Sequence, residues 1–161
     1  MARSLPVVLL FALTGTAFCQ DSQSFDRIER GRYLAVLSDC SACHTATGGA
    51  PFAGGLALQT PFGRLVAPNI TPDPDTGIGR MTEKEFLAAL HDGRGRDGTR
   101  LYPAMPYPAY TKMTDDDVLA IRSYLATIAP IKNSVVSNQL PFPFNIRVVE
   151  SAQFLGRPLS K

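Results

Sequence analysis

The chain has 161 residues, of which 45% are hydrophobic and 19% are charged, and its formal net charge is +2. This length is enough for one globular domain with a real core and a tail. The small net charge and the absence of a basic cluster argue against a nucleic-acid-binding function. The 13 glycines and 13 prolines lie mostly in the middle of the chain, which predicts long loops there.

Residues 1–20 have the features of a secretory signal peptide. Arg3 supplies the positive start, and residues 5–13 form an apolar run that is too short to span a bilayer. Small residues around Ala17 offer cleavage sites. A lipid anchor at Cys19 is the less favoured alternative, because Phe18 fits a lipoprotein cleavage site poorly. We therefore expect an exported, periplasmic protein with no transmembrane span.

The first helix of the mature chain is predicted over Phe25 to Ser38, after a polar, frayed stretch at residues 21–24. Gly31 lies inside this helix, where it lowers helix stability. It indicates either a close crossing of another backbone or a weak helix with a chance glycine. The apolar residues of this helix form a stripe with some spread: Phe25, Ile28, Tyr33, Leu34, Val36 and Leu37.

The sequence Cys40-Ser41-Ala42-Cys43-His44 follows directly, and C-x-x-C-H is the attachment pattern of a covalent c-type haem. Two thiols add across the two haem vinyl groups and become thioethers. The next residue brings an imidazole to the iron from the same side. Residues Cys40, Cys43 and His44 are therefore the predicted haem-binding set, with His44 as an iron ligand.

Two other uses of a C-x-x-C pair fit this sequence less well than haem attachment. A zinc site needs four ligands, and only Cys19 and His91 remain as further cysteine or histidine. A redox dithiol expects a strand before it, whereas the preceding residues predict a helix. Haem attachment is the favoured interpretation.

The middle of the chain is rich in turns. Residues 56–58 and 63–66 are a candidate short hairpin. Asp73 and Asp75 could suggest a calcium site, but the spacing of a calcium-binding loop is missing. Turn chemistry is the favoured role of both carboxylates.

A second helix is predicted from Thr82 to His91, because Thr82 and Glu85 form a capping box. Met81 precedes the cap and can pack on Phe86 as a hydrophobic staple. His91 is expected to be a solvated helix end, where a cation is favoured.

Residues 101–110 contain three prolines, three tyrosines and Met105, which predicts a stiff extended segment without helix that walls a flat apolar ligand. A third helix is predicted from Thr114 to Ile128, capped by Thr114 and ended by Pro130. The extension at residues 131–161 either wraps its own domain or docks on a partner. Residues 147–155 are a candidate short helix within it.

With one protein ligand the iron would be open to small molecules. A second axial ligand would close this sixth position, as in an electron carrier. The candidates are Met81, Met105, Met113 and His91. Met81 and Met113 each precede a capping threonine, which gives both a packing role. Met105 has no such role and lies in the proline-bounded loop, so Met105 is favoured and Met113 is the alternative. A thioether ligand raises the reduction potential relative to a second imidazole.

These features together resemble the class I c-type cytochromes over Phe25 to Pro130. The resemblance implies an all-α fold, with helices around one covalent haem c and long Pro/Gly-rich loops. It implies that the first and last helices cross at Gly31 and Tyr124. It also implies that His44 donates a hydrogen bond to the carbonyl of Pro68, in the Ala67-Pro68-Asn69 turn. Met105-Pro106 is similar to the family's ligand loop.

A narrower resemblance is to the cytochrome subunits of periplasmic alcohol, gluconate and related dehydrogenases, and of some molybdenum hydroxylases. It is carried by residues 67–73, 77–79, 101–107 and 140–145. Those subunits usually hold three haem domains, whereas one C-x-x-C-H is present here. After the signal peptide at residues 1–20, we therefore expect a monohaem domain at residues 21–130 and an extension at residues 131–161.

The function expected from this resemblance is one-electron transfer without catalysis. The donor is a dehydrogenase of the alcohol, aldehyde, sugar or molybdenum hydroxylase type, and the acceptor is a downstream cytochrome or oxidase. Two alternatives stay open: a haem enzyme or gas sensor with an open sixth site, and a structural subunit of a dehydrogenase complex.

Overall fold

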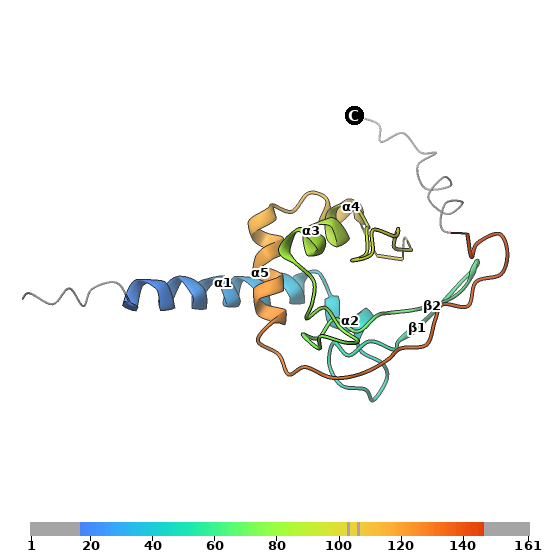
Figure 1. The fold of residues 1–161 in the computed structure, drawn as a ribbon, viewed down its shortest axis with the longest axis horizontal. Coiled ribbons are helices and arrows are strands. Elements are labelled where there is room, and N and C mark those ends of the chain that lie inside the picture. Colours follow the sequence, from blue (N-terminus) through green and yellow to red (C-terminus); the bar gives the residue numbers. More distant parts are fainter. Residues whose placement is uncertain (1–16, 103, 106, 147–161) are drawn as a thin grey trace, which may run out of the picture.

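The computed structural model describes residues 17–102, 104–105 and 107–146. Five helices and one hairpin occur in these ranges (Figure 1). Among the described residues, no helix is long and apolar enough to cross a membrane. The predicted helical fold is thus observed with one small antiparallel sheet added. The elements are α1 (Ala17–Leu37), α2 (Cys40–His44), β1 (Ala57–Thr60), β2 (Gly63–Val66), α3 (Glu83–His91), α4 (Tyr107–Tyr110) and α5 (Asp115–Leu125).

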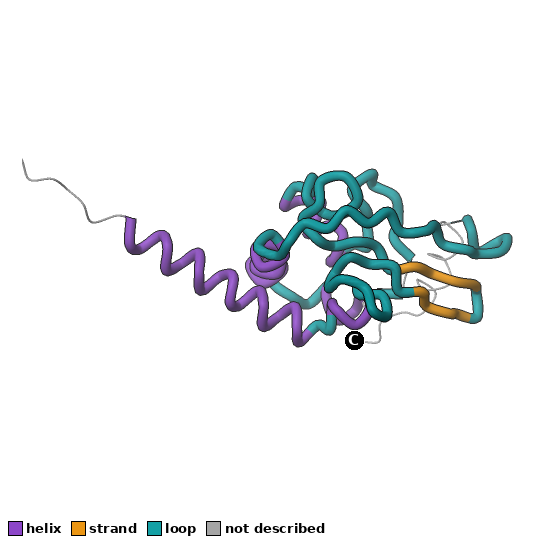
Figure 2. The backbone as a smooth tube through the Cα atoms, turned by 90° about the horizontal axis from the view of Figure 1, so that it is seen from below, coloured by secondary structure: helices purple, strands orange, loops and turns teal. Residues whose placement is uncertain are grey.

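The crossing of α1 and α5 is the centre of the fold (Figure 2). A Cβ atom built on Gly31 would overlap the carbonyl oxygen of Ala120 on α5, so this position of α1 has room for glycine alone. The core around the crossing consists of Ala35, Phe86, Val118, Ile121 and Leu125. Of the two interpretations of Gly31, the close crossing of another backbone is confirmed.

The residue that meets Gly31 differs from the expectation. The nearest atoms to the glycine belong to Ala120 and to the backbone of Ile121, in place of the expected Tyr124. Tyr124 instead packs edge-on against Phe52, with ring centroids 6.3 Å apart. The reason is that Ala120 lies one helical turn before Tyr124 and carries a side chain small enough for the backbones to meet.

The observed bounds of both long helices differ from the predicted ones. α1 begins at Ala17, well before Phe25, because residues 17–24 include no glycine or proline to stop a helix. α5 ends at Leu125 rather than Ile128. After it, the Thr127 hydroxyl donates to the Tyr124 carbonyl at 2.7 Å, which turns the chain out of the helix.

The predicted helix starts at Thr82 and Thr114 are confirmed. The Thr82 hydroxyl accepts from the Glu85 amide, and the Glu85 carboxylate accepts from the Thr82 amide at 2.7 Å, which completes the capping box. The Thr114 hydroxyl accepts from the Asp117 amide at 3.2 Å. The prediction that prolines exclude helix from residues 101–110 is wrong, because α4 includes Pro108; the first turn of a helix tolerates proline.

The predicted hairpin is confirmed with a small shift, since β1 pairs antiparallel with β2 and Leu58 faces Leu65. Beyond Pro130, the chain runs back along the domain to this hairpin (Figure 1). Its Asn133 side chain donates to the Ala53 carbonyl at 2.8 Å, and Gln139 exchanges backbone hydrogen bonds with Arg64. Residues 131–146 therefore wrap their own domain. The predicted helix at residues 147–155 lies outside the described residues.

Substitution of Gly31 tests the crossing. We expect Gly31→Ala to lower the free energy of unfolding by about 3 kcal/mol, because the new methyl group forces α1 away from α5. Gly48→Ala is the control, since its Cβ would meet no atom within 4 Å and only the positive φ of 70° is strained. That strain costs about 1 kcal/mol. Equal losses in denaturant unfolding of the two variants would contradict the role of the crossing.

Truncation tests the wrapping segment. We expect removal of residues 131–161 to lower the thermal midpoint by roughly 5 °C or more, because it leaves several buried polar groups of the domain unpaired. Removal of residues 147–161 alone is the matched control, because it keeps the contacts of residues 131–146. An unchanged melting curve after the longer truncation would show that the wrapping contacts add nothing to stability.

Candidate functional site

Both motif cysteines lie on the short helix α2, which follows α1 after a sharp turn. Asp39 adopts a left-handed conformation with φ 53° and separates the two helices. Cys40 is half-buried and Cys43 is exposed, and both thiols are free. Burial raises the pKa of the Cys40 thiol to about 11. Two reduced thiols spaced by one helical turn are thus available for thioether bonds on one short segment.

His44 ends this helix with one ring nitrogen already engaged. Its Nδ1 lies 2.8 Å from the carbonyl oxygen of Pro68, which can only accept a hydrogen bond. The proton is therefore on Nδ1, and the lone pair of Nε2 is free to bind a metal. Burial lowers the pKa of His44, against the opposing effect of the bond to Pro68, and keeps the imidazole in its neutral, ligating form.

The turn that carries Pro68 is held from both sides. Gly54 approaches it so closely that a Cβ atom there would lie 2.5 Å from the Asn69 amide nitrogen. The Gly54 amide also donates to the His44 carbonyl at 2.8 Å. The loop at Gly54 therefore lies between α2 and the proline turn and sets the distance between them.

Asn69 fixes the same turn through four hydrogen bonds and is only 3% exposed. Its Oδ1 accepts from the amide and the hydroxyl of Thr71, at 2.9 and 2.8 Å. Its Nδ2 donates to the Thr76 hydroxyl at 3.0 Å and to the Ile131 carbonyl at 2.7 Å. All the capacity of a buried amide is used, so the wrapping segment and the proline turn are tied at one side chain. The sequence placed Asn69 in the turn, but no local pattern indicated this role.

Asp73 has the structural role expected of it. Its Oδ1 accepts from the amides of Asp75 and Thr76, at 3.1 and 2.6 Å. These bonds, the Thr76 amide first, lower the pKa of Asp73. Turn chemistry is confirmed for Asp73, whereas the Asp75 carboxylate forms ion pairs with Arg80 and Lys132 instead. In the part of the chain that the structure describes, no group of three or more His, Cys, Asp or Glu side chains could hold a metal ion.

The structure distinguishes two methionines that pack in the core from Met105. Met81 and Met113 are half-buried and pack against the core cluster. Met105 is half-buried but does not belong to that cluster. Pro103 and Pro106, which border it, lie outside the described residues. Met105 as an iron ligand stays a prediction.

Tyr110 links the loop that carries Met105 to the turn just before α2, the attachment helix. Its hydroxyl donates to the Ser38 carbonyl at 3.0 Å, two residues before Cys40. Burial, followed by the nearby thiols of Cys40 and Cys43, raises the pKa of Tyr110 to about 12, so the hydroxyl stays protonated and able to donate. The sequence pattern predicted this tyrosine among the walls of a ligand site, but no sequence signal identified its anchor.

The prediction that His91 is a solvated helix end is wrong. Its side chain is 22% exposed, and Nδ1 lies 3.6 Å from a carboxylate oxygen of Asp115. Its Nε2 is shielded from solvent. The cause is the packing of α3 against α5, which brings the start of α5 over the end of α3.

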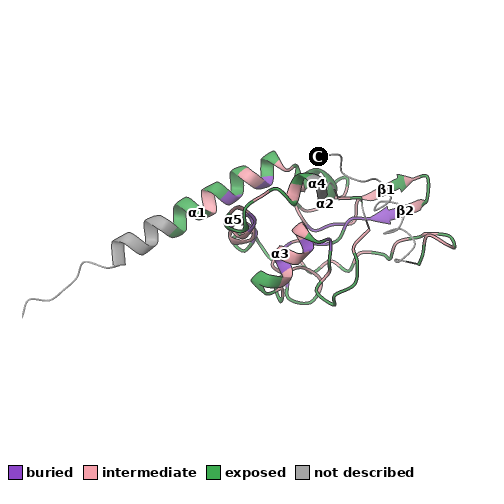
Figure 3. Ribbon diagram, turned by 90° about the horizontal axis from the view of Figure 1, so that it is seen from above, coloured by how far each residue is buried: buried purple, intermediate pink, exposed green. Residues whose placement is uncertain are grey.

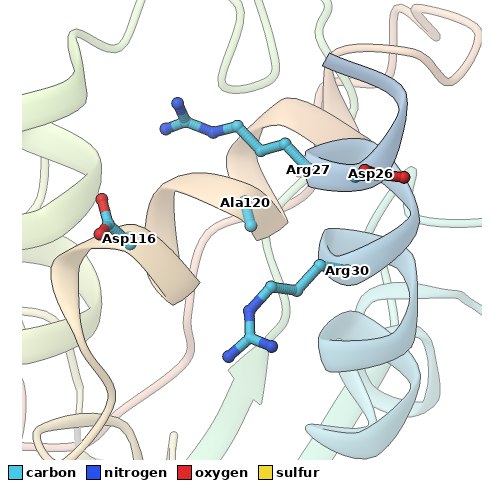
Figure 4. A pocket seen from close by; sticks show the side chains of 5 residues that line it. All are labelled: Asp26, Arg27, Arg30, Asp116 and Ala120. Atoms are coloured by element: carbon cyan, nitrogen blue, oxygen red, sulfur yellow. The ribbon is translucent and has the colours of Figure 1, made fainter. Parts of the chain in front are cut away.

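A surface hollow of about 300 Å³ lies elsewhere, between α1 and α5 (Figure 4). No residue of the attachment sequence lines it. Its lining is Asp26, Arg27, Arg30, Asp116 and Ala120. Arg30 forms an ion pair with Asp117, which compensates its charge. This hollow is distinct from the site at α2.

A helical domain with two free thiols and an oriented neutral imidazole on one short segment is suited to hold haem covalently. The family model described as cytochrome c matches residues 28–129. The chain belongs to the cytochrome c family, whose members bind haem c covalently.

Three relatives of this chain are named as subunits of dehydrogenases. A subunit of the nicotinate dehydrogenase of Pseudomonas putida is 46% identical over 84% of this chain and 12% of its own length. The gluconate 2-dehydrogenase cytochrome c subunit of Pantoea cypripedii is 39% identical over 91% of this chain and 34% of its own. The fructose dehydrogenase cytochrome subunit of Gluconobacter japonicus is 47% identical over 74% of this chain and 25% of its own length. The chain thus spans about a third or less of these relatives. Its resemblance to cytochrome subunits of dehydrogenases is confirmed.

Proposed function

We propose that this chain is a periplasmic monohaem c-type cytochrome that carries single electrons from a dehydrogenase to a downstream cytochrome or oxidase. The observation that carries the proposal is the state of His44, which is neutral, oriented through Nδ1 and one residue away from a free thiol. The names of the relatives, which are dehydrogenase subunits, support a dehydrogenase as the donor.

The residues present fit the haem. Cys40 and Cys43 would form its two thioether bonds, and Nε2 of His44 would bind its iron. The bound haem supplies a reversible one-electron change at iron. The chain fixes the imidazole plane through Pro68 and keeps protons off Nε2 by burial. His44 does not have to gain or lose a proton during electron transfer, which keeps the structural change small.

We infer that Met105 is the second axial ligand. Met81 and Met113 already have packing partners in the core, whereas Met105 does not belong to that cluster. The anchor of Tyr110 at Ser38 supports a Met105 loop held near the attachment helix. A thioether is a neutral and weak donor, so it favours reduced iron and a high potential.

In this proposal residues 1–20 are the cleaved signal peptide, residues 21–130 the haem domain and residues 131–161 an extension. The contacts of residues 131–146 support a structural role for the first part of the extension. Docking on a partner is then a role for its remainder.

The exported wild-type protein tests the electron-carrier function directly. We expect one haem per chain that survives acid acetone, reduction by a periplasmic dehydrogenase in the presence of its substrate, and no binding of carbon monoxide to the reduced form. Absorbance spectra with each reagent measure all three. Rapid carbon monoxide binding would favour the open-site alternative, a haem enzyme or gas sensor. A failure of every dehydrogenase class tested to reduce the protein would contradict the proposed donor.

The ligand assignment predicts a difference between two methionine variants. Met105→Ala should abolish the weak far-red charge-transfer band of a sulfur–iron bond and lower the reduction potential, because a neutral soft ligand is lost. Met113→Ala, the matched control, should keep the band and lose about 2 kcal/mol of stability through a core cavity. Loss of the band in Met113→Ala alone would assign the ligand to Met113 instead.

A further inference from the structure

Phe52 has a backbone conformation that its residue type rarely adopts. Its φ is 62°, in the left-handed region where the Cβ atom of any residue other than glycine is crowded. Among the described residues other than glycine, only Asp39 also has a positive φ. A conformation of this kind persists where the surrounding contacts over-determine it. The contacts of Phe52 show what its unusual chain path achieves.

The backbone of Phe52 joins the two segments that hold the His44 ring. Its amide donates to the Thr45 hydroxyl at 3.1 Å, directly after His44. Its carbonyl accepts from the Ile70 amide at 2.9 Å, two residues after Pro68. A single residue thus links the end of α2 to the proline turn, through two hydrogen bonds that point in different directions.

The next residues add hydrogen bonds to the same two segments, and we call residues 52–55 the clasp. The Gly54 amide donates to the His44 carbonyl at 2.8 Å, and the Gly55 amide donates to the Ala67 carbonyl at 2.9 Å. Figure 3 shows that buried backbone runs from β2 into the proline turn, so this side of the clasp is fixed by the fold. The clasp therefore holds both segments at a set distance.

The side chain of Phe52 accounts for the strained backbone. The ring is half-buried and packs against the core cluster. It meets the ring of Tyr124 on α5 edge-on, with centroids 6.3 Å apart. A change of φ to a negative value would move this ring out of the core or break the two backbone bonds, so ring and backbone hold each other in place. The position of α5 is thereby passed on to the segments around His44.

We propose that Phe52 is a positioning residue for His44 and that it acts through its hydrogen bond to Thr45. The plane of the imidazole is set by the contact of Nδ1 with the Pro68 carbonyl, whose two ends lie 24 residues apart in the sequence. The clasp fixes the distance between these ends, so it determines how the ring is turned when Nε2 binds haem iron. Outer contacts of this kind orient a metal ligand and tune the metal. This inference rests on the proposed binding of haem iron by His44.

Two substitutions at Phe52 separate the role of the backbone from that of the ring. Phe52→Ala and Phe52→Gly both lose the ring, but only glycine adopts a positive φ without strain. We expect the alanine variant to relax and release the bonds to Thr45 and Ile70, and the glycine variant to keep them. In the oxidised holoprotein, the paramagnetic NMR shifts of the haem methyl groups report the orientation of the axial imidazole. These shifts should change in Phe52→Ala and return toward the wild-type pattern in Phe52→Gly.

A matched pair of threonine variants tests the other end of the contact. Thr45→Val removes the hydroxyl that accepts from the Phe52 amide, and it should also change the haem methyl shifts. Because it keeps the ring in the core, it serves as the test where Phe52→Ala does not fold. Thr82→Val is the control, since it removes a hydroxyl that accepts from the Glu85 amide at 3.2 Å, at the start of α3. The control should lower the thermal midpoint but leave the methyl shifts as in the wild type.

Two results would overturn the inference alone. The first is a loss of thermal stability in Thr45→Val and Phe52→Ala with wild-type methyl shifts, which would make the clasp purely structural. The second is a Phe52→Gly variant whose shifts depart from the wild type as far as those of Phe52→Ala, which would assign the effect to the ring. A wild-type protein whose haem iron has no imidazole ligand would overturn the proposed function as well.

Discussion

The backbone contact between Gly31 and Ala120 is the constraint on which the rest of the structure depends. Helix axes normally stay apart by the length of their side chains, whereas here the space for a Cβ atom on α1 is taken by a carbonyl oxygen of α5. This close approach lets Ala35, Val118 and Ile121 close the core without a gap. It also fixes the end of α1, and through it the position of every residue in α2.

From that fixed point, polar contacts to the backbone locate the site. The Tyr110 hydroxyl holds the end of α4 to Ser38, the His44 imidazole holds α2 to Pro68, and the Asn69 amide holds the proline turn to Ile131. Each of these contacts joins segments at least 24 residues apart in the sequence. Long loops without regular structure are therefore kept in place by a few side chains that bind main-chain atoms. A rigid surround of this kind suits a site whose ligands must not move when an electron arrives.

The local features of this fold could be predicted from the sequence, whereas most of its long-range contacts could not. Capping at Thr82 and Thr114 could be predicted because a cap depends on residues three positions apart. The attachment pattern at Cys40 was equally local. The partner of Gly31 could not be predicted in the same way, because a shift of one turn along α5 leaves its apolar periodicity almost unchanged. The wrap of residues 131–146 rests on single amides such as Asn133, whose pairing with Ala53 has no sequence signature.

The spread of apolar residues around α1 follows from two surfaces on one helix. A helix that only covers a core has one apolar face, and its other side is polar. On α1 the face toward α5 holds the small residues Gly31 and Ala35, which contribute little hydrophobicity, while the larger residues Phe25, Tyr33 and Val36 point to water. Burial against α5 cannot account for the outward set, because a helix crossing this close excludes large side chains. The apolar character of α1 therefore exceeds what its packing against α5 requires.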